Sequence, residues 1–365
     1  MKVAVIIDTW FPVIGGGQIN ALEISKLIVK NGHTIDIITR NCGKDNLRLP
    51  KRLNVYKLGP LTDFNNPISK ITFLLRSLLY LHKNDYDMIH AHAFLPGITA
   101  RLLMITKSIP AIFTVHGTSI NTKLLNPLTR RVEKFILTEI LYSAQITVAQ
   151  NFLNFENINK NIFYIPNGVD LKSFKRIKIQ KSKEKLLIFV GRLHPQKNLI
   201  NLIKAMDIVR QKLFVKLLII GDGPQKNELR SFIKRQSLSN IIKLKGQVNQ
   251  SQLKNLYSQS HIFILPSIYE GFPLTLLEAW SAKLPVITSK TGECQYLVKN
   301  GINGYLINNP DSPSDIAKVI TKALENKDLE KLGLSGYNLI KSRFSWDQSA
   351  KQTLDIYESV IAAKN

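Results

Sequence analysis

The chain has 365 residues, of which 44% are hydrophobic, so it is long enough for two folded domains with buried cores. Its two cysteines, Cys42 and Cys294, lie far apart in no metal or redox spacing, which excludes a disulfide framework and fits a reducing compartment. The apolar run before Asp8 is too short for a signal peptide, and no uninterrupted apolar stretch reaches the ~18 residues of a membrane span. We therefore expect a cytoplasmic protein.

The formal net charge of +24 is large and evenly spread. Residues 1–160 contain 19 basic and 10 acidic side chains, a net charge of +9, and residues 161–365 contain 31 and 16, a net charge of +15. Nucleic-acid binding, an anionic membrane surface and a general richness in lysine are three open explanations. The even spread argues against a basic arm, and no zinc-finger, RNP or basic-zipper signature is present, so no nucleic-acid partner is expected.

The chain begins with a strand, a glycine loop and a helix. Val3–Asp8 predicts a buried strand and Gln18–Lys30 a helix. Between them, Gly15, Gly16 and Gly17 leave backbone N–H groups uncovered in front of the helix, which suits a phosphate. The spacing is neither a dinucleotide fingerprint nor a P-loop, so no nicotinamide or Walker-type site follows, and a flexible loop is the alternative.

Strands and helices alternate through the rest of the first half. Ile68–His82 predicts an amphipathic helix with basic side chains near its apolar face, which either packs on a sheet or faces a membrane. Pro127–Ala144 predicts a second basic helix, and the turn-forming sequence 166–168 closes this half. Further strands are expected at Thr34–Thr39, Val55–Leu58, Asp87–His92, Ala111–His116 and Gln145–Ala149.

Three histidines stand at the ends of predicted strands, namely His90, His92 and His116. His90 and His92 share one face of their strand, a spacing that would suit zinc. No carboxylate or cysteine stands at ligand spacing nearby, so we predict no metal site.

The second half repeats the strand, loop and helix order. Lys185–Val190 predicts a strand and Lys197–Lys212 a helix, with Arg192 and Lys197 at the connecting loop. A guanidinium and an ammonium group suit a diphosphate, and their place after a buried strand favours that role over two solvated charges. Further strands are expected at Leu217–Gly223, Ile241–Gly246 and 285–289, and helices within Pro313–Arg343 and Phe344–Ala362.

The most informative run is 265–282, LPSIYEGFPLTLLEAWSA. A buried strand ends at Pro266, a polar loop follows, and helical spacing starts at Leu274. The free N–H groups of that helix face the crevice at the carboxyl end of the strand, where open α/β sheets bind ligands. Two glutamates eight positions apart are also common by chance. In that case Glu270 would be a solvated loop residue, and Glu278 would be a helix residue that the helix dipole favours. The candidate residues are Glu270, Gly271, Phe272, Pro273, Leu274 and Glu278.

Several strings together resemble retaining glycosyltransferases of family 4, which have the GT-B fold. The string E-G-F-P-L-T-L-L-E-A is similar to the EX7E motif of that family, and IHAH, TVHG, IPNGVD and GRLHPQKN extend the resemblance over nearly the whole chain. The sequence departs from the family in two places. Asn198 stands where glycine is frequent, and Gly292–Tyr296 lacks the usual second glycine and Pro-Glu pair, so the choice of donor can differ.

The resemblance implies the partners of the chain. It implies a nucleotide diphosphate sugar as donor and a sugar or lipid-linked molecule as acceptor, with no cofactor and no metal. The loop Gly15–Gly17 would lie under the donor phosphates, and His116 would face the donor sugar. His90 and His92 would be structural or near the acceptor.

The resemblance also assigns roles in the second half. Arg192 and Lys197 would stabilise the leaving diphosphate in place of a metal. Glu270 would hold sugar hydroxyls beside the N–H groups of Gly271–Leu274, and Glu278 would bind the ribose.

Alternation of strands and helices in both halves predicts an α/β protein, here a GT-B fold of two Rossmann-like domains with parallel sheets facing a central cleft. We expect an N-terminal acceptor-side domain at 1–170, a linker at 171–185, a C-terminal nucleotide-sugar-binding domain at 186–343, and a helix at 344–365 that crosses back to the N-terminal domain.

The expected activity is retaining, metal-independent transfer of a hexose-type sugar in glycan or glycolipid synthesis. The alternatives are a GT-B sugar-nucleotide epimerase and, from another class, a basic nucleic-acid-binding protein. UDP-, GDP- and ADP-sugars are all candidate donors, and the charge suggests peripheral binding to the inner face of an anionic membrane.

Overall fold

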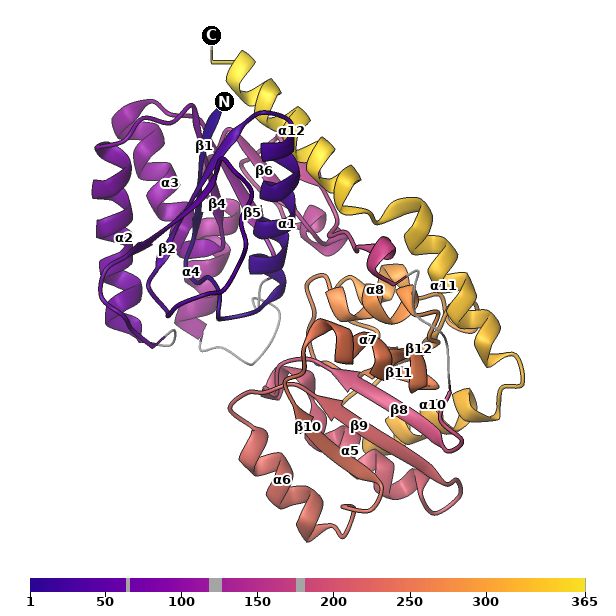
Figure 1. Cartoon of the computed structure of the whole chain (residues 1–365). Helices are drawn as coiled ribbons and strands as arrows, with labels where there is room; N and C mark the ends of the chain where they lie inside the picture. Colours follow the sequence, from indigo (N-terminus) through magenta and orange to yellow (C-terminus); the bar gives the residue numbers. More distant parts are fainter. Residues whose placement is uncertain (64–65, 118–126, 175–180, 365) are drawn as a thin grey trace. The chain divides into compact units, whose positions relative to one another are not determined.

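The computed structural model describes residues 1–63, 66–117, 127–174 and 181–364 (Figure 1). The chain divides into two compact units. Unit 1 comprises Met1–Gly168 and Trp346–Asn365, and unit 2 comprises Val169–Ser345. The stretch that we expected to be a linker, 171–185, falls in unit 2, and its residues 175–180 lie outside the described part of the chain.

Unit 1 is built on a parallel sheet of seven strands in the order β3-β2-β1-β4-β5-β6-β7. The order reverses between β1 and β4, so the loops after these two neighbouring strands leave in opposite directions from one edge of the sheet, the place where sheets of this kind bind ligands. The strands are β1 (Lys2–Ile7), β2 (Thr34–Arg40), β3 (Leu53–Leu58), β4 (Met88–His92), β5 (Ala111–Val115), β6 (Ala144–Thr147) and β7 (Ile162–Tyr164).

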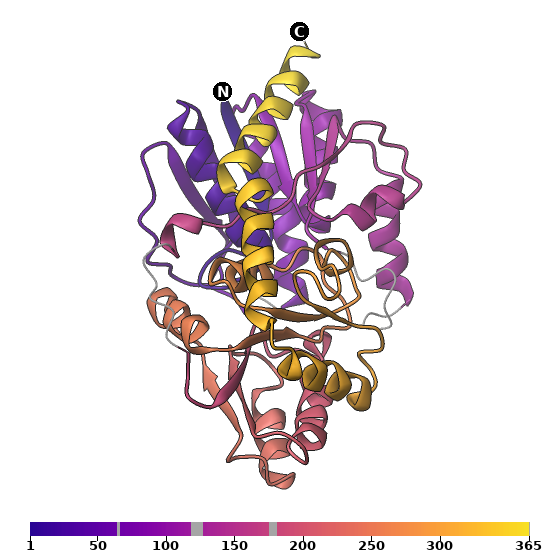
Figure 2. The same cartoon turned by 90° about the vertical axis from the view of Figure 1, so that its right-hand side faces the viewer.

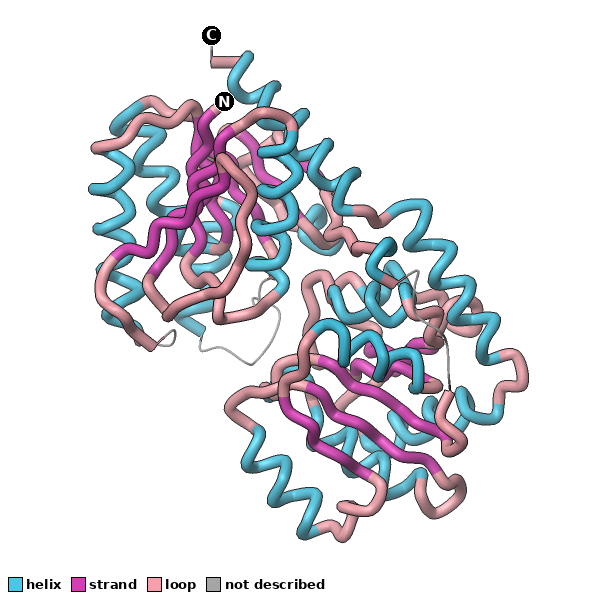
Figure 3. The backbone as a smooth tube through the Cα atoms, viewed as in Figure 1, coloured by secondary structure: helices cyan, strands magenta, loops and turns pink. Residues whose placement is uncertain are grey.

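Helices cover both faces of this sheet, as Figure 3 shows. One face carries α1 (Gly16–Lys30) and the C-terminal helix α12 (Trp346–Ala362), which pack on each other, and Figures 1 and 2 both show α12 lying along unit 1. The other face carries α2 (Pro67–His82), α3 (Phe94–Lys107) and α4 (Pro127–Thr138), with α3 in contact with both of its neighbours. This arrangement explains why the strands are apolar on both sides.

Unit 2 repeats the architecture with a parallel sheet of six strands in the order β10-β9-β8-β11-β12-β13. Here the order reverses between β8 and β11. The strands are β8 (Lys185–Val190), β9 (Val215–Ile220), β10 (Ile242–Gly246), β11 (Ile262–Leu265), β12 (Val286–Ser289) and β13 (Tyr305–Ile307). The helices are α5 (Leu199–Val209), α6 (Lys226–Arg235), α7 (Gln250–Gln259), α8 (Leu274–Ser281), α9 (Cys294–Leu297), α10 (Pro313–Glu325) and α11 (Leu329–Arg343).

Local sequence explains where several helices begin. Asn66 and Ser312 each accept a backbone N–H bond at the start of a helix whose first residue is proline, which has no N–H of its own to satisfy. Asn249 caps α7 in a reciprocal capping box with Gln252. Asp170, the last residue of IPNGVD, caps the 3-10 turn Leu171–Ser173 by accepting the backbone N–H groups of Lys172 and Ser173.

Several helix limits differ from the sequence-based expectation, and two of the differences have a local cause. The helix that we predicted over Pro127–Ala144 ends at Thr138, because Ser143 donates its N–H to Ala111 and Ala144 already belongs to β6. Helical periodicity alone did not reveal that change. The helix predicted from Lys197 starts at Leu199, because Asn198 has a left-handed backbone, with φ of 57°, that ends a short 3-10 turn.

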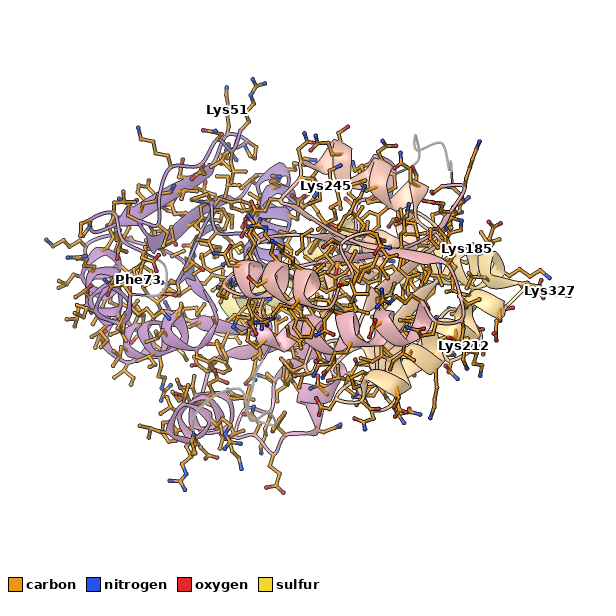
Figure 4. All side chains as sticks on the ribbon, turned by 90° about the horizontal axis from the view of Figure 1, so that it is seen from below. Lys51, Phe73, Lys185, Lys212, Lys245 and Lys327 are labelled. Atoms are coloured by element: carbon orange, nitrogen blue, oxygen red, sulfur yellow. The ribbon has the colours of Figure 1, made fainter. Side chains whose placement is uncertain are left out.

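The positive charge lies on the surface of both units. Lys51, Lys185, Lys212, Lys245 and Lys327 are all exposed and stand on different elements (Figure 4). Among the described helices, none is both long enough and apolar enough to cross a membrane.

Candidate active site

The main candidate site lies at the strand-order reversal of unit 2. The loop after β8 contributes Arg192 and Lys197, and the loop after β11 contributes Glu270. Because β8 and β11 are adjacent and parallel, both loops leave the same edge of the sheet. The topology alone therefore brings these residues together, although they are distant in sequence.

Lys197 and Glu270 form the centre of this site. Nζ of Lys197 lies 2.5 Å from Oε1 of Glu270, and the hydroxyl of Ser267 donates to the same oxygen at 2.5 Å. Glu270 is only 5% exposed, so its charge is stabilised by these two donors rather than by water. The site thus holds a buried carboxylate that is bound to an ammonium group and to a hydroxyl.

Neighbouring amides fix the two loops against each other. Gln196 donates its side-chain amide to the carbonyl of Tyr269 at 2.8 Å, and its own carbonyl accepts the N–H of Ile268 at 2.9 Å. Asn198 donates to the carbonyls of Pro266 and Pro310. Asparagine tolerates the left-handed conformation better than most residues do, which explains why it can replace the glycine that is frequent at this position.

The loop after β12 closes against the backbone of Glu270. Gly292 has φ of 51°, and a Cβ at this position would lie 1.6 Å from the carbonyl oxygen of Glu270, so only glycine fits. Glu293 is fully buried and donates its N–H to the carbonyl of Gly271 at 3.1 Å. The loop that departs from the family sequence therefore touches the candidate site directly.

The start of α8 supplies backbone donors to the same crevice. Pro273 is the N-cap residue and α8 begins at Leu274, with no acidic side chain in the first turn and no side-chain cap. Phe272 is buried and packs on Phe344, with ring centroids 5.8 Å apart, which anchors the loop. Backbone N–H groups at a helix start that lack a cap favour an anionic or hydroxyl-bearing ligand.

Glu278 lies on α8 and binds Tyr257 rather than Lys197 or Glu270. The hydroxyl of Tyr257 donates to its Oε2 at 3.1 Å. Burial raises the pKa of Glu278 to about 7, while the Tyr257 hydrogen bond and the charge of Lys254 oppose this rise. Glu278 is therefore a second, separate carboxylate that changes its charge near neutral pH.

Arg192 and Lys197 produce a local positive potential at the loop after β8. The pKa of His194, which stands between them in sequence, is lowered by burial and by the charges of Arg192 and Lys197. Arg192 is exposed at the surface. An anion that enters here would meet a guanidinium group, an ammonium group and a helix start.

In unit 1 the glycine loop and His116 also come together. The helix α1 starts at Gly16, earlier than the sequence suggested, with Gly15 as an N-cap that has no side chain. A Cβ on Gly17 would lie 3.3 Å from Cδ2 of His116, so the glycine lets the ring approach the backbone of α1. Nothing lies within 4 Å of a Cβ on Gly16.

His90, His92 and His116 form a row in unit 1. Nδ1 of His92 lies 2.7 Å from Nε2 of His116, and the rings of His90 and His92 are 4.3 Å apart. Burial is the main cause that lowers the pKa of His116 to about 4, that of His90 to about 3, and that of His92 well below its usual value, so all three are neutral at pH 7. Within the described residues, no group of three or more His, Cys, Asp or Glu side chains has the arrangement of a metal site.

Three contributing side chains were given no role from the sequence. Tyr257 lies on α7 and Glu278 on α8, with β11 and a loop between them, so no local sequence pattern identifies Tyr257 as the partner of Glu278. Tyr357, on the C-terminal helix, binds His90 at 2.6 Å, and it reads in sequence only as one apolar position of an amphipathic helix. Ser267 stood in the motif-bearing loop but had no role until the fold placed it on Glu270.

Comparison with known families adds to this geometry. A family described as "Glycosyltransferase Family 4" matches residues 14–173, and a family described as "Glycosyl transferases group 1" matches residues 172–338. The two matches meet where the chain passes from unit 1 to unit 2.

Similar proteins cover the whole chain. An uncharacterised glycosyltransferase of Methanocaldococcus jannaschii is 25% identical, with 98% of each chain covered. An Escherichia coli UDP-Gal:α-D-GlcNAc-diphosphoundecaprenol α-1,3-galactosyltransferase is 27% identical, with 97% of this chain and 96% of that protein covered.

Solved structures share the fold. The sucrose-phosphate synthase of Thermosynechococcus elongatus has a TM-score of 0.88 and 23% identity over 99% of both chains. Anabaena HepE, in complex with UDP and glucose, has a TM-score of 0.80 and 18% identity over 98% of this chain and 100% of its own. These likenesses and the two parallel-sheet units confirm the GT-B fold.

Proposed function

We propose, from the premise that this chain is a GT-B glycosyltransferase of the family 4 type, that it transfers a sugar from a nucleotide diphosphate sugar to an acceptor hydroxyl with retention of anomeric configuration. The chain is related to enzymes of glycolipid and glycan synthesis. The observation that carries the proposal is the contact of Lys197 with Glu270 at the strand-order reversal of unit 2. It unites a cation for a phosphate and a carboxylate for sugar hydroxyls in one place.

Lys197 and Arg192 would stabilise the leaving diphosphate. As the bond between the anomeric carbon and the phosphate oxygen breaks, negative charge grows on the diphosphate, and preorganised cations meet it best. In the structure Lys197 is bound to Glu270. Donor binding would turn the ammonium group toward phosphate and leave Glu270 and Ser267 to bind sugar hydroxyls. This role replaces a catalytic metal, so we propose metal-independent transfer.

The remaining candidate residues would hold the donor. Glu278 would accept hydrogen bonds from the ribose hydroxyls, and the N–H groups of Gly271–Leu274 would bind beside Glu270. In unit 1, His116 would contact the donor sugar, and the backbone N–H groups of Gly15–Gly17, at the start of α1, would bind phosphate and acceptor. The solved structures of HepE contain UDP, UDP and glucose, or UDP-glucose, which makes a UDP-sugar the first donor to test.

Retention follows from attack on the face that the phosphate leaves. The acceptor oxygen forms its bond to the anomeric carbon on that face, and its proton passes to the departing phosphate oxygen. Once the donor has drawn Lys197 to the phosphate, Oε1 of Glu270 would still accept the Ser267 hydroxyl and would accept the sugar hydroxyls, so we assign it to orienting hydroxyls rather than to attack on the anomeric carbon. No covalent intermediate is therefore proposed.

We further propose that the chain works at an anionic membrane surface, on a lipid-linked acceptor. The support is a membrane-facing surface on unit 1, which we define as the outer sides of α2, α3 and α4. Large apolar side chains that are 48% to 70% exposed lie at helical spacing on this surface: Ile68, Ile71, Leu75 and Leu79 on α2, Ile105 on α3, and Leu128, Val132 and Phe135 on α4.

The basic side chains on the same helices suit an anionic membrane surface. Helix α2 contains Lys70 and Arg76 and no acidic residue. Helix α4 contains Arg130, Arg131 and Lys134, and its only acidic residue is Glu133. Apolar side chains with cationic flanks insert at the boundary of anionic lipid headgroups. The relative from E. coli is named for an acceptor on a diphosphoundecaprenol lipid.

The experiment that tests the activity begins with the donor. Thermal shifts with UDP-glucose, UDP-galactose, UDP-GlcNAc, GDP-mannose and ADP-glucose identify the donor, and Lys197→Ala serves as the matched variant. We expect one nucleotide class to stabilise the protein, and nucleotide release to rise on addition of acceptor. Stabilisation by duplex DNA with none by any nucleotide sugar, or interconversion of nucleotide sugars without acceptor, would overturn the proposal.

A further inference from the structure

His92 and His116 form a hydrogen-bonded pair in unit 1, and His116 is the residue proposed to contact the donor sugar. We propose that His92 is a positioning residue for His116, which it holds in a single tautomer and ring orientation through a ring-to-ring hydrogen bond. Nδ1 of His116 then presents one fixed donor or acceptor to the sugar. The inference rests on the proposed contact between His116 and the donor sugar.

The geometry of the pair follows from the sheet. β4 and β5 are adjacent and parallel, with His92 opposite Thr114, so His116 stands two positions further on the same face. Nδ1 of His92 and Nε2 of His116 are 2.7 Å apart, and the two ring planes differ by 17°. The distance is that of a full hydrogen bond between two ring nitrogens.

One proton between the rings decides what the far side of His116 can do. A neutral imidazole has one donor nitrogen and one acceptor nitrogen. If His92 donates, Nδ1 of His116 carries the other proton and is a donor; if His116 donates, Nδ1 is an acceptor. Nδ1 of His116 is buried and has no hydrogen-bond partner among the described residues. It is therefore the atom that a sugar hydroxyl would satisfy.

His92 is itself held on its other side. Its ring lies 4.3 Å from the ring of His90, whose two nitrogens are both engaged, Nδ1 with the hydroxyl of Tyr357 and Nε2 with Thr114, each at 2.6 Å. His90 and Tyr357 are almost fully buried, so the ring of His92 is packed against a rigid neighbour. The ring of His116 lies close to Gly17, where an added Cβ would stand 3.3 Å from its Cδ2. Because packing holds the ring of His92 in place, the hydrogen bond between His92 and His116 decides which tautomer His116 adopts.

Substitutions at His92 separate hydrogen bonding from packing. In His92→Asn the amide stands near the position of Nδ1 and can donate or accept, whereas His92→Leu keeps much of the volume and removes the bond. We expect His92→Leu to lower kcat about 10-fold to 100-fold with the donor KM within about threefold, and His92→Asn to stay within about fivefold of wild type. Tyr86→Phe removes a buried hydrogen bond of unit 1, from the Tyr86 hydroxyl to Asp36, that involves none of the three histidines, and it controls for lost stability with wild-type kcat.

A second readout does not depend on activity. In protein labelled with ¹⁵N-histidine, the ring nitrogens of His116 should report one neutral tautomer in wild type and a mixture in His92→Leu. Wild-type kcat in His92→Leu, an equal loss in His92→Asn, or an unchanged tautomer in His92→Leu would each overturn the inference. Wild-type kcat in His116→Ala would instead overturn the proposed sugar contact, while the tautomer measurement would still test the coupling of the two rings.

Discussion

Nζ of Lys197 lies 2.5 Å from Oε1 of Glu270, although the two residues are 73 positions apart in sequence. The contact exists because the strand order of unit 2 reverses between β8 and β11, which places the two loops side by side. From the sequence, Lys197 is expected to bind the diphosphate of the donor and Glu270 its sugar hydroxyls. Their ion pair holds the two loops together, and under the proposed function the donor would divide the pair between phosphate and sugar.

Substitution of a phosphate-binding residue should mainly lower turnover, whereas substitution of a ribose-binding residue should mainly lower donor affinity. Lys197→Ala should leave donor affinity within about tenfold and lower turnover by about 10²–10³, because the charge on the diphosphate grows only in the transition state. Glu278→Ala should mainly weaken donor binding, by about 1.5–3 kcal/mol for a lost charge-assisted hydrogen bond. Glu270→Ala should impair both. Calorimetry with the donor and single-turnover rates measure the two effects, and sugar transfer by Lys197→Ala at the wild-type rate would refute the site.

The glycine beside Glu270 gives a steric test. Gly292→Ala would place a Cβ 1.6 Å from the carbonyl oxygen of Glu270, so the loop after β11 must move. We expect turnover to fall about tenfold or more, since small displacements in a site are costly. Gly301→Ala is the matched control, because Gly301 also has a positive φ, of 78°, but an added Cβ there meets nothing within 4 Å. Equal turnover in the two variants would show that the contact with Glu270 has no functional consequence.

Glu278 should make donor binding depend on pH. Its pKa of about 7 lies above the value of 4.5 for a free carboxyl group, so the ionised form increases as pH rises from 6 to 8. The affinity for UDP-glucose, whose diphosphate diester does not titrate in this range, should therefore increase over this interval. Titration calorimetry of wild type and Glu278→Gln tests this, and we expect the variant to bind weakly with no such pH dependence.

The same shift predicts an effect on stability of known sign. Between pH 4.5 and about 7 the folded protein holds a proton on Glu278 that the unfolded chain releases, so this group makes folding less favourable as pH rises. Glu278→Gln removes that contribution. The Tm of the variant relative to wild type should be higher at pH 8 than at pH 5, and a constant difference would contradict the assignment.

The membrane-facing surface should act through its exposed apolar side chains. Leu75→Ser with Leu79→Ser should reduce co-sedimentation with vesicles rich in phosphatidylglycerol, and leave Tm almost unchanged because both side chains are exposed. Phe214→Ser with Ile302→Ser removes equally exposed apolar side chains from unit 2 and should leave binding intact. Binding of wild type should weaken with salt and be low on neutral vesicles. Absence of binding at low salt, or self-association through this surface instead, would exclude the membrane as its partner.

Much of the fold was accessible from the sequence, because apolar runs and turn residues mark each strand. Lys185–Val190 was predicted with its observed limits. The helix after Pro127 was predicted too long, since the apolar residues that continue its periodicity belong to the next loop and strand. Strand order is not written in local periodicity. It emerges only when the sheet forms, and it is what brings Lys197 to Glu270.

The candidate site was partly accessible for the same reason. Glu270 and Lys197 follow strands and stand in specific strings, so their residues could be named, although their mutual contact could not. Tyr257 and Tyr357 could not be named, because a buried tyrosine that serves as a hydrogen-bond partner looks in sequence like any core aromatic residue. His92 was assigned a structural or acceptor-side position, and the structure gives it a partner in His116.

Retaining transfer by this chain should depend on Lys197 rather than on a metal. The most direct measurement is the anomeric configuration of the product, read by proton NMR, after reaction of the donor with its acceptor in the presence of EDTA. We expect the anomeric configuration of the donor sugar in the product, at a rate that EDTA does not change and that Lys197→Ala reduces about 10²–10³-fold. A product of inverted configuration, or transfer that EDTA abolishes and magnesium or manganese restores, would contradict the account.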